Sequence, residues 1–363
     1  MRENLAMTFA ADLKSLVECQ SPTEDLQACT KVVELAADIS ERVLGKRAEV
    51  LDENGRPIFW WGAKSPEIIL LAHLDTVWPH GSFTPVWSVE GDVVRGPGTF
   101  DMKAGFLQAM YALAEVDSKS SIALIATTDE EVGSQTSRAL IERLARSAKA
   151  VLVLEASLNG KVKTGRKGTA MYRISIHGRA SHAGLEPEKG INATTEIALI
   201  VAQVLALQDS AQGTTVVPTT MRSGTTTNTV PALATLDLDI RSYAKNELER
   251  VDAAVRALKT SHPEAKIEID GKINRPPLEP TSTMALYEKL EQVAKELGMA
   301  PIGHASVGGA SDGNFAAAAG APTLDGLGAV GDGAHAPHEH ILLSTVPNRI
   351  ALLTGLLKEL TRE

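Results

Sequence analysis

Hydrophobic residues recur along the chain in two patterns that alternate. Short continuous apolar runs, EIILLAH near residue 70, SIALIATT near residue 125 and KAVLVLE near residue 152, are typical of strands buried on both faces of a parallel sheet. The intervening stretches KAGFLQAMYALAEV and SQTSRALIERLARSA are typical of helices. Strands that alternate with helices predict a mostly parallel sheet covered by helices on both faces.

Two helices and a hairpin are expected to precede this sheet. Phe9, Leu13 and Leu16 share helical spacing, and a second helix should follow residues 21–24 and end near Gly45. The Asn54-Gly55 pair separates AEVLD from RPIFWW, which is a strong hairpin signal. These segments are expected to be scaffold.

The pattern changes near residue 165 and returns near residue 276. GTAMYRISIHG alternates like a half-exposed strand, a long helix follows Asn192, and ATLDLDIRS and AKIEIDGKI flank another helix. This predicts a smaller open-faced sheet with helices on one side. We therefore predict an α/β core domain over residues 1–165 and 276–363, with an α+β domain inserted over residues 166–275.

Composition and charge exclude several classes of protein. The 363 residues are 44% hydrophobic, and a formal net charge of -9 without a basic run argues against binding nucleic acid. Two cysteines, Cys19 and Cys29, do not make a disulfide framework. The sequence has no secretory signal and no run of about 18 apolar residues, so we expect no membrane contact and a cytoplasmic protein.

Acidic and imidazole side chains gather where the predicted parallel strands end. His73 ends EIILLAH, and Asp75 lies two residues on, so an extended backbone would place both on one face. Glu130 and Glu131 follow the second strand, and adjacent residues there point in different directions. Glu155 ends KAVLVLE, where a carboxylate is costly unless it is paired or metal-bound. Open α/β folds place their sites at this edge of the sheet.

Two further candidates lie in glycine-rich turns. Asp101 sits in RGPGTFDMKAG at the start of a helix, and His335 sits in GDGAHAPHEH with Glu339 four residues later. Each candidate also has an ordinary structural explanation. Asp101 would serve as a helix N-cap, the paired Glu residues would complement a helix dipole, and His335 would belong to a surface cluster with His338 and His340.

Together these residues offer two imidazoles, three carboxylates and a spare Glu, which suits a pair of borderline cations. Zinc fits this ligand set, and cobalt or manganese is conceivable. If Asp101 bridged the two ions, each ion would also have one His and one terminal carboxylate. Such a pair activates a shared hydroxide and polarises an amide carbonyl, and the remaining Glu would act as general base.

Several motifs resemble one known family. HLDTVWP, GPGTFDMKAG, TTDEEVGS, LVLEAS, GRASHAGLEPEKGINA, TTTNTVP, LDIR and GDGAHAPHE are similar to motifs of the dinuclear zinc metallopeptidases. This family includes glutamate carboxypeptidases of the carboxypeptidase G type, aminoacylases and succinyl-diaminopimelate desuccinylases. The resemblance spans nearly the whole chain. It implies two Zn²⁺ per subunit, with Co²⁺ or Mn²⁺ as substitutes, held by His73, Asp101, Glu131, Glu155 and His335.

The resemblance implies further roles. Asp101 would bridge the ions, Glu130 would be the general base, and Asp75 would orient His73. The insertion would be a ferredoxin-like lid, a four-stranded antiparallel sheet with two helices, through which a homodimer forms. His182 would reach the partner's active site and stabilise the tetrahedral oxyanion; without the resemblance it is a surface loop histidine. Substrate carboxylates would be bound by Lys163, Asn228, Arg241 and Arg275.

The expected function is hydrolysis of an amide bond next to a free C-terminal carboxylate. The leading hypothesis is a glutamate-type carboxypeptidase acting on peptidyl or N-acyl amino acids. The alternative is an aminoacylase or deacetylase of N-acyl amino acids. A non-catalytic metal or amino-acid binding module is a third hypothesis, against which the intact Glu130 argues. The expected partners are a small-molecule or peptide substrate with a free carboxylate and a second copy of the chain.

Overall fold

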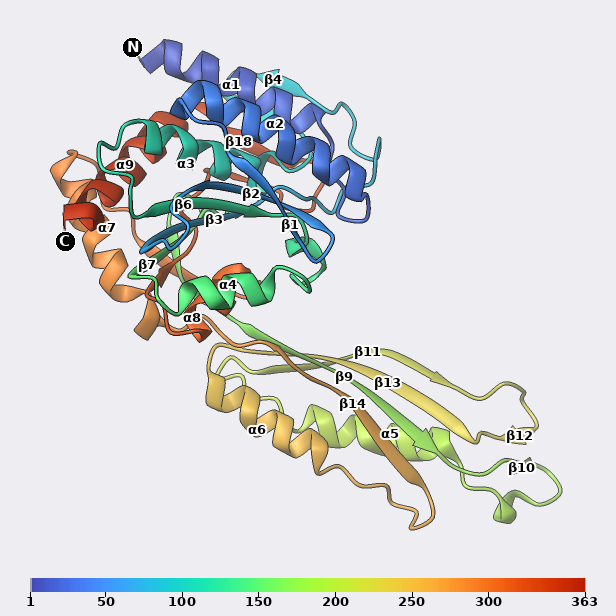
Figure 1. The fold of residues 1–363 in the computed structure, drawn as a ribbon. Helices are drawn as coiled ribbons and strands as arrows, with labels where there is room; N and C mark the ends of the chain where they lie inside the picture. Colours follow the sequence, from blue (N-terminus) through green and yellow to red (C-terminus); the bar gives the residue numbers. More distant parts are fainter. Residues whose placement is uncertain (1, 363) are drawn as a thin grey trace. The chain divides into compact units, whose positions relative to one another are not determined.

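The computed structural model describes residues 2–362, with side chains from residue 7 onward, and the chain divides into two compact units (Figure 1). The first unit comprises the described residues up to Gly165, Glu279–Val307 and those from Ser311 onward. The second unit comprises Arg166–Leu278 and the short segment Gly308–Ala310. Each unit has its own hydrophobic core.

A six-stranded mixed sheet forms the centre of the first unit, in the order β1-β2-β6-β3-β7-β16. Strands β6, β3, β7 and β16 are parallel to one another, whereas β1 and β2 form an antiparallel hairpin at one edge. The mostly parallel sheet and the hairpin were both predicted from sequence, and both are confirmed. The strands are β1 (Glu49–Glu53), β2 (Arg56–Gly62), β3 (Ile68–His73), β6 (Ile122–Thr127), β7 (Ala150–Val153) and β16 (Thr323–Leu324).

Both faces of this sheet are covered, which explains the continuous apolar runs. In β3, Ile68 and Leu70 pack into one hydrophobic cluster, whereas Ile69 and Leu71 pack into a second cluster on the opposite face. Helices α1 (Arg2–Glu18), α2 (Leu26–Leu44), α3 (Ala104–Ala114), α7 (Met284–Glu296) and α9 (Val346–Arg362) contribute to the first cluster. Helices α4 (Arg138–Ala145) and α8 (Asp312–Ala318) contribute to the second cluster.

Short strands that the hydrophobic pattern did not predict join distant parts of the first unit. A four-stranded sheet has the order β17-β18-β5-β4, and β8 pairs with β15. In the four-stranded sheet, His340 is paired in register with Arg95, so the segment after residue 95 lies beside the segment before residue 340. These strands are β4 (Ser88–Glu90), β5 (Val93–Arg95), β8 (Val162–Arg166), β15 (His304–Val307), β17 (Gly331–Asp332) and β18 (His340–Leu342).

The second unit is a four-stranded antiparallel sheet in the order β11-β13-β9-β14, with two helices packed on one face. Alternate residues of β9, including Tyr172, Ile174 and Ile176, form its core with the helices. The α+β fold predicted for the insertion is confirmed. Its main elements are β9 (Gly168–His177), α5 (Ala193–Leu205), β11 (Thr215–Ser223), β13 (Leu233–Ser242), α6 (Lys245–Arg256) and β14 (Lys266–Arg275), with the small pair β10 (Ser181–His182) and β12 (Thr229–Val230).

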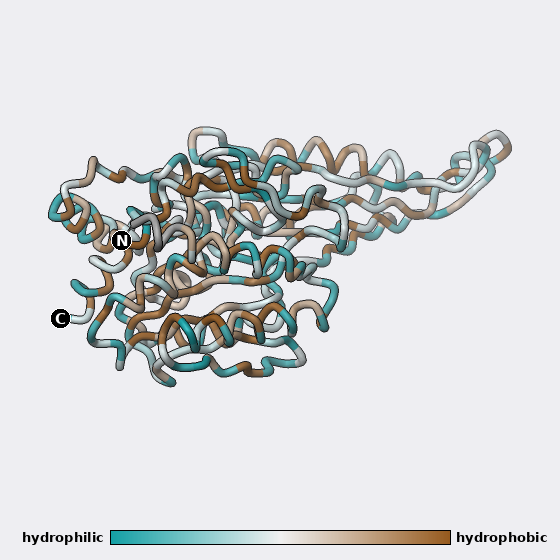
Figure 2. The backbone as a smooth tube through the Cα atoms, turned by 90° about the horizontal axis from the view of Figure 1, so that it is seen from above, coloured by the Kyte–Doolittle hydropathy of each residue, from teal (hydrophilic) through white to brown (hydrophobic). Residues whose placement is uncertain are grey.

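Hydrophobic and hydrophilic positions alternate at short intervals throughout the chain trace (Figure 2). Among the residues that the structure describes, no helix is long and apolar enough to cross a membrane. Cys19 and Cys29 are both free thiols; Cys19 is partly buried and Cys29 is buried.

Candidate metal centre

Three parallel strands bring predicted ligands to one edge of the central sheet. Because β3, β6 and β7 are parallel neighbours, their carboxyl ends share that edge. His73 is the last residue of β3, Glu130 and Glu131 begin the short turn after β6, and Glu155 lies two residues beyond β7. The local apolar pattern therefore delivers one imidazole and three carboxylates to the same region.

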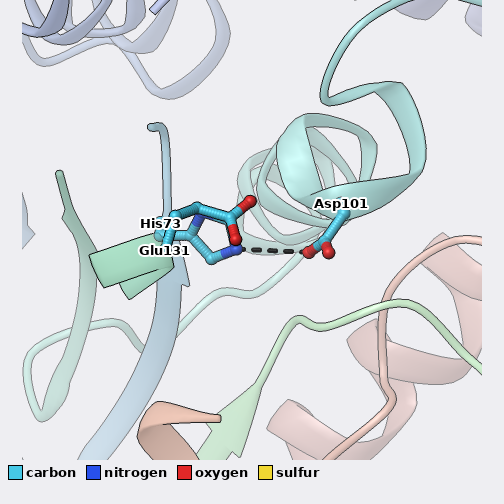
Figure 3. A group of neighbouring side chains, drawn as sticks. All are labelled: His73, Asp101 and Glu131. Carbon is cyan, nitrogen blue, oxygen red and sulfur yellow. Dashed lines mark hydrogen bonds and ion pairs between the residues drawn. The ribbon is translucent and has the colours of Figure 1, made fainter. Parts of the chain in front are cut away.

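Asp101 lies between two imidazoles. It belongs to the turn Thr99–Lys103 that leads into α3, and no side chain caps the first turn of that helix, so the N-cap alternative is not what the structure shows. Its Oδ1 lies 3.2 Å from His73 Nε2, and its Oδ2 lies 3.3 Å from His335 Nε2. Figure 3 shows the first of these contacts together with Glu131. A carboxylate that presents one oxygen to each of two histidines is suited to bridge two cations.

Each imidazole also has a carboxylate of its own. Glu131 Oε2 lies 3.0 Å from His335 Nε2, and Glu155 Oε1 lies 3.8 Å from His73 Nε2. Ligand atoms of His73, Asp101 and Glu131 all lie within 4.8 Å of one another. Nitrogen and carboxylate donors at such spacings fit zinc, so the residues present match the metal that the sequence implied.

His335 is held in an unusual backbone conformation. Its φ of 61° is left-handed, a region that costs a residue other than glycine about 1–2 kcal/mol. The preceding Gly333 also has a positive φ, of 85°, and forms the start of the turn. His340, which the surface-cluster explanation groups with His335, lies with its Nδ1 2.8 Å from the His338 carbonyl oxygen.

Asp75 fixes the orientation of His73 in a way that sequence did not specify. His73 Nδ1 lies 3.0 Å from the backbone carbonyl oxygen of Asp75 and 3.4 Å from its carboxylate Oδ1, so the carbonyl is the nearer acceptor. A proton on Nδ1 leaves Nε2 available to a cation. The buried carboxylate instead uses Oδ2 to accept hydrogen bonds from Thr23 Oγ1, at 2.8 Å, and the Glu131 backbone N–H, at 3.2 Å.

The electrostatics of the cluster favour positive charge. Burial lowers the pKa of His73, but hydrogen bonds to Asp101 and Asp75 outweigh it and raise the pKa well above its usual value. Bonds to Asp101 and Glu131 raise the pKa of His335 to about 10. Burial raises the pKa of Glu131 to about 7, whereas the two imidazoles overcome burial and hold the pKa of Asp101 far below its usual value. Protons and a cation therefore compete for the same atoms.

Glu339 contacts this centre in a way that sequence analysis missed. Its carboxylate is 0% exposed and accepts hydrogen bonds from the Trp78 indole N–H and from the backbone N–H groups of Gly98, Phe100 and Asp101. The only sequence signal was an acidic residue placed four positions after His335. The burial of Glu339 depends on the pairing of β5 with β18, which the hydrophobic pattern did not predict.

Lys163 lies beside the cluster within the first unit. It belongs to β8, its side chain is 12% exposed, and its Nζ lies 4.0 Å from Glu155 Oε2. A nearly buried ammonium therefore borders the side of the centre that Glu155 and His73 occupy.

The other predicted substrate-binding and catalytic residues lie in the second unit, in two separate groups. His182 ends β10, and Asn228 directly precedes β12, which pairs with β10. Arg241 and Arg275 lie in one row of the large sheet, because each is paired in register with Thr169 of β9. The eight remaining residues of β9, 170–177, separate this row from the segment that carries His182, a length of about 27 Å. The second unit thus does not bring these four residues to one place.

Local contacts define the chemistry of two of these residues. His182 Nδ1 accepts hydrogen bonds from the backbone N–H groups of Gly184 and Leu185, both at 3.1 Å, so its neutral ring carries the proton on Nε2. The exposed ring can therefore donate from Nε2. Arg241 pairs with Asp239 through two hydrogen bonds of 2.9 and 3.0 Å, and this pairing raises the pKa of Arg241. The Arg241 guanidinium is therefore already bound to a carboxylate of the same strand.

Comparisons with known proteins identify the family of the chain. The peptidase family M20/M25/M40 matches residues 69–359. Carboxypeptidase G2 of Pseudomonas sp. (strain RS-16) is 33% identical over 314 residues, which cover 82% of this chain and 75% of that protein. A succinyl-diaminopimelate desuccinylase of Hydrogenovibrio crunogenus is 26% identical over 310 residues, which cover 78% of this chain and 81% of that protein.

Among solved structures, the fold is similar to that of aminopeptidase PepT from Bacillus cereus, with a TM-score of 0.79, 23% identity and coverage of 98% of this chain and 99% of that one. This similarity confirms the predicted fold class, and the sequence matches confirm the resemblance inferred from the motifs. The chain therefore belongs to peptidase family M20/M25/M40 and is a metallopeptidase or related amidohydrolase.

Proposed function

We propose that the chain is a two-metal carboxypeptidase that releases a C-terminal amino acid, with glutamate favoured, from peptidyl or N-acyl substrates. The position of Asp101 carries this proposal, because its two oxygens face the Nε2 atoms of His73 and His335. Glu155 and Glu131 complete a symmetrical set of donors. We propose these five residues as the ligands of two Zn²⁺ ions, with Co²⁺ or Mn²⁺ as substitutes.

The protein groups around these ligands have defined tasks in this proposal. Two bound cations would supply Lewis acidity that activates water and polarises the scissile carbonyl. Glu130, adjacent to Glu131 in the short turn after β6, takes a proton from the attacking water and transfers it to the leaving nitrogen. Asp75 holds His73 with Nε2 directed at Asp101. Glu130 thus handles the protons, while its neighbour Glu131 serves as a ligand.

The test of the function combines metal analysis with a hydrolysis screen. The purified protein should contain about two zinc ions per chain, by the ligand count of a two-metal site. It should hydrolyse peptidyl and N-acyl substrates with a C-terminal carboxylate, and it should not hydrolyse the corresponding C-terminal amides. Equal rates on the carboxylates and the amides would contradict a carboxypeptidase. Bound metal without hydrolysis of any substrate would favour the non-catalytic binding module.

Lys163 supports glutamate as the favoured residue. A carboxypeptidase and an aminoacylase both need one cationic side chain for the α-carboxylate, but a second cationic side chain near the centre is useful chiefly for an acidic substrate side chain.

Lys163→Ala should raise KM for substrates ending in glutamate by about 10–100-fold, because a charged hydrogen bond is lost. Substrates ending in alanine should change little. The exposed neighbour Lys161 provides a matched control, and Lys161→Ala should leave both KM values unchanged. Equal losses on both substrates would favour the aminoacylase alternative.

We further propose that the second unit forms a homodimer and that His182 donates Nε2–H to the oxyanion in the partner's site. Arg241 and Arg275 of one subunit would bind the substrate carboxylate, and Asn228, which lies with His182, would reach it from the partner. The distance of His182 from the arginine row within one unit supports a role in another subunit.

Mixing experiments test this shared site. His182→Ala and Glu130→Gln should each be inactive alone, and random re-association should restore about a quarter of wild-type activity, because half of the dimers regain one of two sites. Proven heterodimers without activity would rule out the shared site.

A further inference from the structure

We propose that Glu339 is a positioning residue. It holds the Asp101 carboxylate and the two segments that carry His73 and His335 in the positions that two metal ions require. This proposal rests on the proposed metal centre and concerns how its ligands are held. Glu339 is itself outside the ligand set, and its carboxylate is fully buried.

Each oxygen of Glu339 accepts two hydrogen bonds. Oε1 accepts from the backbone N–H groups of Phe100, at 3.0 Å, and Asp101, at 3.1 Å. Oε2 accepts from the Trp78 indole N–H, at 2.9 Å, and the Gly98 N–H, at 3.1 Å. Two consecutive N–H groups bound to one oxygen fix the peptide planes on both sides of residue 100, so the Asp101 side chain starts from a fixed backbone. The φ torsion of Asp101 and its side-chain torsions then set the position of the carboxylate.

The same residue is bound to the turn that carries His335. The Glu339 N–H donates to the Ala336 carbonyl oxygen at 2.9 Å, and the Ala336 N–H donates to the Gly333 carbonyl oxygen at 2.8 Å. Gly333 is required here, because a Cβ at this position would lie 2.9 Å from the Glu339 backbone nitrogen. Glu339 is therefore part of the folded turn that holds His335 in its left-handed conformation.

Trp78 joins the third segment to this arrangement. It lies five residues after His73 in HLDTVWP, and its ring packs edge-on against Phe83 with centroids 5.0 Å apart. One carboxylate thus links the segments of His73, Asp101 and His335, which lie far apart in the sequence. Groups that orient metal ligands from outside the ligand set typically change metal affinity about 10–100-fold when they are replaced.

The experiment compares Glu339→Gln and Trp78→Phe with wild type. The amide of Glu339→Gln places an NH₂ group against N–H donors, so the turn must shift. We expect an affinity for Co²⁺ about 10–100-fold weaker by titration, and a changed visible absorption spectrum of the Co²⁺-loaded protein. Trp78→Phe removes one donor to Oε2 and keeps both bonds to Oε1, so it should change the spectrum in the same direction by a smaller amount.

Glu196→Gln is the matched control. Glu196 is a buried carboxylate of the second unit that accepts hydrogen bonds from the Ser261 N–H and hydroxyl and from the His262 N–H. Its replacement should lower thermal stability and leave the Co²⁺ affinity and spectrum unchanged. Wild-type affinity and spectrum in Glu339→Gln would overturn the proposal, whatever its stability. If Glu339→Gln does not fold, an unchanged spectrum in Trp78→Phe overturns it instead. These readouts decide the role of Glu339 even if the wild type hydrolyses no amide.

Discussion

Replacing Glu130 with Gln should lower kcat by about 10²–10⁴-fold, because general acid–base catalysis contributes that much and the amide cannot accept a proton. The variant should still bind metal and substrate, since Glu130 is outside the proposed ligand set. Steady-state kinetics would measure the loss, and elemental analysis would measure zinc per chain. Retention of wild-type kcat in Glu130→Gln would exclude Glu130 as the base.

The neighbouring residue supplies the control for this experiment. Glu131 Oε2 lies 3.0 Å from His335 Nε2, and its pKa of about 7 reflects burial beside Asp101. Glu131→Gln has the same change of charge and nearly the same volume, but it should lose metal as well as activity. The two variants would thus separate a base from a ligand at adjacent positions. If both variants kept their metal, the assignment of Glu131 would be wrong.

Asp101→Asn should remove both ions and abolish hydrolysis. The carboxylate offers one oxygen to the side of His73 and the other to the side of His335. An amide offers one oxygen only, and its NH₂ group repels a cation. We expect zinc content to fall from about two ions per chain to well below one, with kcat/KM lower by at least about 10³-fold, by analogy with the loss of a catalytic metal.

Glu155→Gln provides the contrast for the bridge. Glu155 Oε1 lies 3.8 Å from His73 Nε2, on one side of the centre. Its replacement should therefore weaken the binding of one ion and leave the other ion bound. Zinc content near one ion per chain in Glu155→Gln, together with the loss of both in Asp101→Asn, would support a bridge. Loss of a single ion in both variants would show that Asp101 serves one ion only.

The hydrophobic pattern was sufficient to predict the frame of the site. Continuous apolar runs predict buried parallel strands. Because the carboxyl ends of neighbouring parallel strands share one edge of the sheet, His73, Glu131 and Glu155 lie at that edge. The hairpin followed from Asn54 and Gly55, both of which adopt positive φ. These features depend on residues close together in sequence, which is why sequence alone predicts them.

The details of the centre required tertiary structure. The bond from Gly98 N–H to Glu339 joins residues 241 positions apart, and it exists because β5 and β18, which are only a few residues long, pair with each other. Strands this short have no clear period in the sequence. In the same way, the carbonyl oxygen of Asp75 contacts His73 Nδ1, whereas its carboxylate accepts a hydrogen bond from Thr23. Which of the two groups contacts His73 depends on packing.

The sequence by itself thus determined the family, the candidate ligands at the strand ends and the existence of a second α+β unit. The tertiary structure alone decided that Asp101 faces two imidazoles and that Glu339 is buried against the three segments that carry His73, Asp101 and His335. The physical reason is that periodicity reports which faces are buried, whereas hydrogen bonds between distant loops depend on how the buried faces bring those loops together.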